Sequence, residues 1–308
     1  MTTTDFHPDL RLARFLPHSV VGPRRLWLIR RLIRLQPAGR AANAVVEQAG
    51  PGVRVRVFRP AGGHGPRPGV LWVHGGGLII GSAAMDDARC RAFADRLGAI
   101  VVSVEYRLAP EYPFPIPLED CYTGLRWLAA HPDVDADRIA IGGDSAGGGL
   151  TAALAMLARD RGRIHPIMQL LVYPMLDDRS SARTDIDRSR LRMWDQDSNR
   201  LGWNSYLGPA SVGAVPPLAV PARHEDLTGL PPAWIGVGTH DLFHDEDIAY
   251  AERLRAAGVP CALEVVPGAY HGFDHVEAGA EVAKAFFRAQ VAALSAAFEG
   301  RQPDPDNL

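Results

Sequence analysis

The sequence has few cysteines, almost no lysine and no long apolar run. Its three cysteines, Cys90, Cys121 and Cys261, are far apart and odd in number, so no disulfide framework or metal-ligand spacing can be built from them. We expect them to be buried like small hydrophobic residues. Lys284 is the only lysine among 33 basic residues, a bias that we attribute to codon usage rather than to chemistry.

The charge and hydropathy of the chain argue against several kinds of partner. The 308 residues carry a net charge of −2, which gives no reason to expect binding to nucleic acid. No apolar run approaches the roughly 18 residues that a transmembrane helix needs. Residues 1–15 also lack the basic start and apolar core of a signal peptide. We therefore expect a cytoplasmic protein without stable membrane insertion.

Short β-rich runs alternate with helical patterns from residue 44 onward, which is typical of an α/β fold. The expected strands lie at 44–48, 53–58, 69–74, 99–104, 138–143, 168–173, 233–238 and 261–266. Helices are expected at 85–97, 117–130, 146–161, 246–257 and 277–298. The early run at 53–58 alternates with a period of two, whereas the later runs are almost continuously apolar. The pattern predicts a mostly parallel, doubly wound sheet with an antiparallel beginning and helices on both faces.

Two segments do not follow this alternation, and we expect them to form a cap over a catalytic core. The cap segments are residues 1–43 and 177–220, which leaves 44–176 and 221–308 for the core. The first cap segment contains an Arg-rich amphipathic helix at 23–35. Its apolar face comprises Leu26, Ile29, Leu32 and Ile33. Such a helix can lie on a membrane surface, but packing against its own protein with solvated arginines is commoner.

Ser145 lies in the sequence GGDSAGGG (142–149), between an apolar run and a helical pattern. In a G-x-S-x-G turn the serine occupies a strained position that lifts its hydroxyl above the edge of the sheet. Gly143 and Gly147 flank the serine, where a Cβ would collide with neighbouring elements. A phosphate-binding loop is the alternative, but the chain lacks both the P-loop lysine and a dinucleotide-binding GxGxxG pattern. We therefore interpret Ser145 as a nucleophile.

A second glycine cluster, His74–Gly75–Gly76–Gly77, follows another expected strand. Consecutive glycines leave backbone N–H groups free to approach an oxyanion. The helix that begins at Ala146 presents a further N–H where its dipole favours negative charge. We expect the N–H groups of Gly76, Gly77 and Ala146 to form the oxyanion hole, and His74 to shape the loop rather than to act as a base.

The acid and the base are expected after the serine, in the order Ser, Asp, His. Asp241 is the acidic residue nearest to the end of the strand at 233–238. The acidic residues at 245–247 fall where the next helix begins and are explained by capping or by the helix dipole. His271 follows the last strand and precedes a glycine that allows a tight turn, while His275 lies one helical turn further on. We therefore assign the base to His271 and its orienting acid to Asp241.

These motifs resemble those of bacterial hormone-sensitive-lipase-like esterases in the α/β-hydrolase superfamily. The resemblance is carried by HGGG (74–77), EYRLAPEYPFPIPLEDC (105–121), GDSAGG (143–148), DLFHDE (241–246) and HGF (271–273). It implies an α/β-hydrolase fold with an eight-stranded core and a helical cap, and hydrolysis of carboxylic esters without a metal or organic cofactor. Two positions depart from the family pattern: Leu242 stands where proline is usual, and Leu78 where an aromatic residue is common.

The resemblance also implies that the substrate is a small-molecule ester with a short- to medium-chain acyl group. An apolar substrate pocket is expected from Leu78, Trp194, Trp203 and Tyr206. An amide or formamide hydrolase, a non-catalytic ligand receptor on the same fold and a membrane-associated lipase are the alternatives. A monomer and a homodimer through the edge strand at 261–266 are both open, since Pro260 and Pro267 would blunt that edge.

Overall fold

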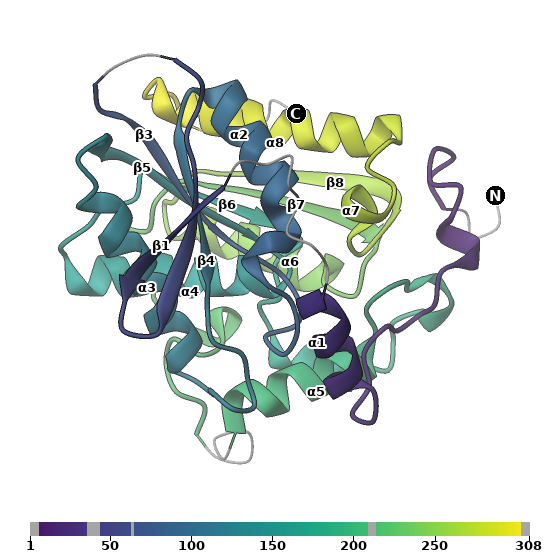
Figure 1. Cartoon of the computed structure of the whole chain (residues 1–308). Helices are drawn as coiled ribbons and strands as arrows, with labels where there is room; N and C mark the ends of the chain where they lie inside the picture. Colours follow the sequence, from purple (N-terminus) through teal and green to yellow (C-terminus); the bar gives the residue numbers. More distant parts are fainter. Residues whose placement is uncertain (1–5, 36–43, 63–64, 209–213, 303–308) are drawn as a thin grey trace.

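The computed structural model describes residues 6–35, 44–62, 65–208 and 214–302. Within these ranges, eight strands form one sheet in the order β1-β2-β4-β3-β5-β6-β7-β8 (Figure 1). The strands are β1 Val45–Gly50, β2 Val53–Phe58, β3 Arg67–Val73, β4 Ile100–Glu105, β5 Val134–Asp144, β6 Met168–Val172, β7 Ala233–His240 and β8 Cys261–Tyr270. Strand β2 pairs antiparallel with β1 and β4, and all other neighbours pair in parallel. The predicted α/β fold is confirmed, including its antiparallel beginning.

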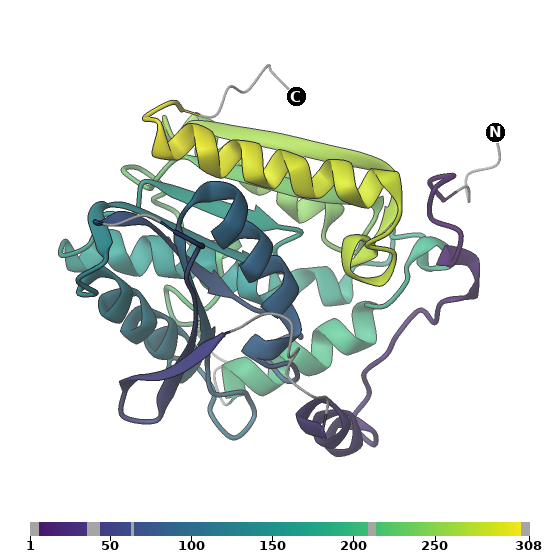
Figure 2. The ribbon, with the colours of Figure 1, turned by 45° about the horizontal axis from the view of Figure 1, so that its top comes forward.

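Helices cover both faces of this sheet. The α-helices of the described residues are α1 Leu26–Leu35, α2 Asp87–Leu97, α3 Ile116–Ala129, α4 Ala146–Arg161, α5 Gln196–Leu207, α6 His244–Ala256, α7 Phe273–Val276 and α8 Glu281–Phe298, of which α1 and α5 lie beyond the ends of the strands (Figure 1). Residues of α2 and α8 share one hydrophobic cluster, and those of α3, α4 and α6 share the other. In Figure 2, α2 (blue) and α8 (yellow) lie on the same side of the sheet, in front of the strands. The central strands are buried on both faces, which explains their continuously apolar sequence.

Strand β3 shows how one apolar run contributes side chains to the hydrophobic clusters on both faces of the sheet. Leu71 and Val73 belong to the cluster with α3 and α4, whereas Val70 and Trp72 belong to the cluster with α2 and α8. Successive side chains point to opposite faces of a strand, so an unbroken apolar run fills two layers at once. All three cysteines are buried and free, as expected.

The two predicted cap segments contact each other. In the first segment, the Ser19 hydroxyl lies 2.6 Å from that of Ser198 in α5, and the carbonyl of Pro17 accepts a hydrogen bond from the N–H of Met193 at 2.9 Å. Residues 1–5, 36–43 and 209–213 of these segments lie outside the described residues. The division into cap and core stays a prediction, and these contacts agree with it.

Helix α1 differs from its prediction at two residues. Leu26, Ile29 and Ile33 pack against the core, but Leu32 is 56% exposed. Arg30 is not solvated as expected, because its Nε donates to the carbonyl oxygen of Ile79 at 2.6 Å. The helical period alone does not show that the arginine lies over the HGGG loop. In the described part of the chain, no helix is both long enough and apolar enough to cross a bilayer.

An aromatic group centred on Phe286 of α8 packs against rings near the ends of β6, β7 and β8. The Phe286 ring lies 5.0 Å from that of Phe273, 5.4 Å from that of Trp234 and 6.4 Å from that of Tyr173. Phe286 is 1% exposed, so its truncation leaves a cavity where three rings meet.

We predict that Phe286→Ala lowers the free energy of unfolding by about 3–5 kcal/mol, through lost burial and the cavity left behind. Urea denaturation followed by circular dichroism measures the change. Phe15, which is 77% exposed, provides the control, and Phe15→Ala should stay within about 0.5 kcal/mol of the wild type. Equal effects of the two substitutions would contradict this description of the core.

Candidate active site

The backbone turn between β5 and α4 places Ser145 in a strained conformation. Its φ of 53° and ψ of −121° fall in a region that residues with a side chain rarely adopt. A Cβ on Gly143 would lie 2.5 Å from the carbonyl oxygen of Gly147, and one on Gly147 would lie 2.1 Å from that of Val73. The turn can therefore form only with glycine at both flanking positions, as the sequence pattern predicts.

The side chains of Ser145, His271 and Asp241 form one chain of hydrogen bonds. Ser145 Oγ lies 2.9 Å from His271 Nε2, and His271 Nδ1 lies 2.8 Å from Asp241 Oδ2. The other oxygen of Asp241 accepts the N–H of Phe243 at 3.0 Å. Because the carboxylate can only accept, Nδ1–H donates to it and the lone pair of Nε2 faces the serine hydroxyl. The structure thus brings together the three residues predicted from chain order.

Two aromatic rings restrict the orientation of the His271 ring. The ring of Phe243 meets it edge-on at 5.1 Å and an interplanar angle of 90°, and that of Tyr173 meets it at 4.9 Å and 65°. The side chain of Asp241 is completely buried and that of His271 is 10% exposed. The imidazole is therefore fixed by packing as well as by its hydrogen bonds.

The loop after β3 bends sharply at the predicted oxyanion-hole residues. Gly76 and Gly77 have φ values of 113° and 59°, and a Cβ would lie 2.2 Å from the Ile80 oxygen at the first and 2.0 Å from the Trp194 ring at the second. Outside the helices and strands of the described residues, no backbone hydrogen bond is donated by Gly76, Gly77 or Ala146. Their N–H groups are therefore free of backbone acceptors at this point of the turn.

His74 contacts the loop rather than the triad. Its Nδ1 lies 2.7 Å from the carbonyl oxygen of Gly75, and its ring stacks on that of Tyr106 at 4.2 Å. The Tyr106 hydroxyl donates to the His74 carbonyl at 3.0 Å. These contacts agree with the loop-shaping role expected for His74.

A cavity of about 200 Å³ opens at Ser145. Its apolar lining comes from Val20, Ile80, Met85, Met193, Trp194 and Val276. Trp194 was predicted in the pocket, whereas Leu78, Trp203 and Tyr206 do not line this cavity. These three are at most 3% exposed and belong to the core, because composition does not reveal whether an apolar side chain faces a cavity or the interior. Val20 and Met193 carry no spacing signal that could have indicated them.

Of the two explanations offered for the acidic residues at 245–247, the structure agrees with the helix dipole and not with capping, because all three lie in the first turn of α6. The N-cap residue of α6 is Phe243, which makes no side-chain capping bond. Glu246 also accepts the N–H groups of Leu176 and Asp177 at 2.7 and 3.1 Å, and these bonds connect the chain after β6 to α6. Burial raises the pKa of Glu246 to about 8.

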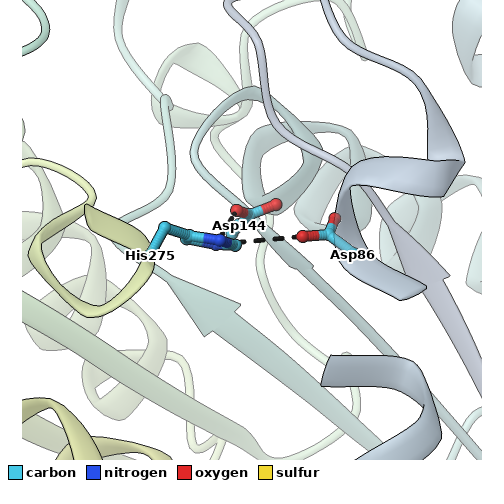
Figure 3. A group of neighbouring side chains, drawn as sticks. All are labelled: Asp86, Asp144 and His275. Carbon is cyan, nitrogen blue, oxygen red and sulfur yellow. Dashed lines mark hydrogen bonds and ion pairs between the residues drawn. The ribbon is translucent and has the colours of Figure 1, made fainter. Parts of the chain in front are cut away.

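A second group of charged residues lies beside Ser145 and was not predicted to act together. Asp86, Asp144 and His275 approach one another at the wall of the cavity (Figure 3). His275 Nε2 lies 2.8 Å from Asp144 Oδ2 and 3.8 Å from Asp86 Oδ1. Asp144 directly precedes the serine, so this group is joined to the strained turn.

A metal ion fits this group poorly, although its ligand atoms lie within 4.8 Å of one another. Arg89 Nη2 lies 3.0 Å from His275 Nε2, the nitrogen that would have to bind the ion. A guanidinium at that distance repels a second cation. Burial, followed by the negative charge of Asp144, raises the pKa of Asp86, which disfavours the ionised form that a metal ligand requires.

Comparison with known proteins shows the family to which the chain belongs. The profile of the alpha/beta hydrolase fold family matches residues 70–275. Esterase LipI of Mycobacterium tuberculosis is 37% identical over 225 residues, which cover 67% of this chain and 65% of LipI, slightly under two thirds of its length. Carboxylesterase NlhH of the same species is 39% identical over 226 residues, which cover 72% of this chain and 71% of NlhH.

Among solved structures, a bacterial heroin esterase superimposes with a TM-score of 0.86 and 36% sequence identity. The superposition covers 97% of this chain and 99% of that protein. The likeness therefore extends beyond the residues matched by the family profile and includes the described parts of both predicted cap segments.

We predict that Gly147→Ala lowers the free energy of unfolding by about 3 kcal/mol, because the added Cβ collides with backbone rather than with a movable side chain. Gly279→Ala is the control, since a Cβ there has nothing within 4 Å. Chemical denaturation of both variants measures the difference. A Gly147→Ala variant as stable as Gly279→Ala would show that the turn is not compressed as described.

Proposed function

The chain belongs to the alpha/beta hydrolase fold family, and from this membership we propose that it is a serine carboxylesterase that hydrolyses small esters. The observation that carries the proposal is the continuous hydrogen-bonded chain from Ser145 through His271 to Asp241 on a strained turn. Its relatives LipI and NlhH are named esterase and carboxylesterase. The resemblance to hormone-sensitive-lipase-like esterases points to the same activity.

In the proposed reaction, Nε2 of His271 removes the proton of the Ser145 hydroxyl as the oxygen attacks the ester carbonyl carbon. Asp241 holds the imidazole in the required tautomer and stabilises its charged form. The imidazolium then gives its proton to the departing alcohol, which leaves an acyl group on the serine. Water, deprotonated by the same histidine, releases the carboxylic acid and regenerates the enzyme.

The negative charge that develops on the carbonyl oxygen is stabilised by the N–H groups of Gly76, Gly77 and Ala146. Ala146 is the first residue of α4, so its N–H has no partner within the helix and lies at the positive end of the helix dipole. Loss of one such donor typically costs about 2.7–4 kcal/mol of transition-state stabilisation.

The size and lining of the cavity support a short- to medium-chain acyl group. Its volume of about 200 Å³ lies below the range of about 300–1,000 Å³ that is usual for drug-sized ligands. Val20 and Trp194, from the two predicted cap segments, supply apolar walls. We therefore propose that residues 1–43 and 177–220 act as a cap that limits the length of the substrate.

The quaternary structure and location belong to the same proposal. Strand β8 is at the edge of the sheet, with Pro260 before it and Pro267 within it. The protein would act as a monomer or as a homodimer through this edge, in the cytoplasm, and on small molecules rather than on nucleic acid.

We predict that Ser145→Ala reduces kcat for p-nitrophenyl butyrate by about a million-fold, because it removes the nucleophile, and that Asp241→Asn reduces it by about 10,000-fold, because it removes the partner of Nδ1–H. Release of p-nitrophenolate measures the rate. Ser189→Ala, at an exposed serine, should match the wild type. A wild type that is folded but inactive on this ester, or a fully active Ser145→Ala variant, would refute the esterase proposal.

We predict that Trp194→Ala shifts the acyl preference toward longer chains, because removal of the indole enlarges the cavity. The ratio of kcat/KM for the p-nitrophenyl decanoate and butyrate esters should rise by about tenfold, the lower end of what one methylene contributes in an apolar pocket. Trp27→Ala is the control, since Trp27 is 64% exposed on α1. An unchanged ratio in Trp194→Ala would place the acyl group elsewhere.

A further inference from the structure

The proposed nucleophile and base come from strands that are not neighbours. Ser145 follows β5, whereas His271 follows the edge strand β8, and β6 and β7 lie between them. One hydrogen bond of 2.9 Å joins the two side chains directly. In the proposed mechanism this bond is broken and remade in every cycle. A second connection that does not react would keep the two segments in register while this bond is broken.

The four-residue helix α7, which begins two residues after His271, carries such a connection. His275 Nε2 lies 2.8 Å from Asp144 Oδ2, and Figure 3 shows the imidazole directed toward the two carboxylates. Asp144 is the residue immediately before Ser145. The contact thus joins the segment that holds the base to the turn that holds the nucleophile, without involving either reacting side chain.

Asp274, the neighbour of His275, fixes α7 from two other sides. Its Oδ1 accepts the hydroxyl of Tyr173 at 2.7 Å, and its Oδ2 accepts Arg89 Nη2 at 2.6 Å. Tyr173 follows β6 and also touches the His271 ring, and Arg89 belongs to α2. Helix α7 is therefore held by β6, by α2 and, through His275, by the turn after β5.

The distances and charges around His275 support an ion pair with Asp144. Arg89 donates through Nη2 to Asp274 and through Nη1 to Gln290 at 3.1 Å. Its Nη2 also lies 3.0 Å from His275 Nε2, but Asp144 Oδ2 lies closer, at 2.8 Å, and a carboxylate can accept the proton on Nε2. Burial and Arg89 oppose the charged imidazolium, but Asp144 and Asp274 outweigh them and the pKa of His275 is raised. Burial likewise opposes ionisation of Asp144, yet the hydrogen bond and charge of His275 lower its pKa.

We propose that the Asp144–His275 ion pair is a positioning device for the reaction, which holds His271 within hydrogen-bond distance of Ser145 while the bond between them is broken and remade. This inference rests on the proposed esterase function. His275 acts through the position of His271, and Asp144 acts through the position of Ser145. Burying the Asp144 carboxylate costs desolvation free energy. The gain that offsets this cost is the fixed distance between His271 and Ser145.

The test compares the kinetics of His275→Gln, His275→Ala, Asp144→Asn and the double variant Asp144→Asn/His275→Gln on p-nitrophenyl acetate. His275→Ala and Asp144→Asn should lower kcat by about 10- to 100-fold, which is what a misplacement of about 1 Å costs, with KM changed less than about twofold. The side-chain amide introduced by His275→Gln retains an N–H donor toward Asp144, so this variant should recover part of the kcat lost in His275→Ala. The double variant should be no slower than its slower parent, because the two substitutions remove one shared contact.

Lys284→Gln is the matched control. Lys284 lines a second cavity, which His275 also borders. It takes no part in the hydrogen bonds described, so kcat of the Lys284→Gln variant should equal that of the wild type. Thermal unfolding of each variant separates a misplaced base from an unfolded protein. His275 is 35% exposed in its side chain, so its variants decide the question if Asp144→Asn does not fold.

The inference is overturned if His275→Ala keeps kcat within about twofold of the wild type, or if the losses in the two single variants multiply in the double variant. A loss of wild-type activity on chelation, restored by Zn²⁺, would also overturn it, because the group would then hold a metal in place of the ion pair. Failure of the esterase proposal is distinguishable, since the wild type and Lys284→Gln would then both lack turnover.

Discussion

The compressed turn at Ser145 is the constraint on which the rest of the site depends. A residue with a side chain takes φ of 53° only where its surroundings over-determine it. Here the two flanking glycines allow the β3 carbonyls and the start of α4 to approach so closely that no Cβ could fit. The same approach brings the HGGG loop beside the serine, so one packing arrangement places both the nucleophile and the groups proposed to bind the oxyanion.

The parallel sheet supplies the remaining parts by aligning the carboxyl ends of β3, β5, β7 and β8. Asp241 and His271 follow adjacent strands β7 and β8, so their contact of 2.8 Å follows from topology. The contact between His271 and Ser145 does not, because two strands separate β8 from β5. The ion pair of buried Asp144 with partly exposed His275 bridges that gap, at a desolvation cost that hydrophobic packing alone would not incur.

The sequence allows the meeting of Ser145, Asp241 and His271 to be predicted because each follows an apolar run at a position where few residues can perform the chemistry. The eight strands and their order along the chain can be predicted equally well, since buried parallel strands and glycine-rich turns have strong local sequence signals. The direction in which side chains of irregular segments point cannot be predicted from such local signals. Leu78, Trp203 and Tyr206 have the composition of a pocket but pack in the core, and Arg30 contacts Ile79 instead of solvent. The contact of His275 could not be predicted from the sequence either, because nothing in the residue spacing shows which side chain of α7 faces Asp144.

The measurement that tests the central claim most directly is the site at which an active-site-directed phosphonate attaches to the protein. The intact mass and a peptide map after treatment with p-nitrophenyl methylphosphonate ethyl ester would locate the adduct. The account predicts one adduct per chain, on Ser145, that forms much more slowly when His271 is replaced by Ala. An adduct on another residue, or one that forms on Ser145 equally fast without His271, would contradict it.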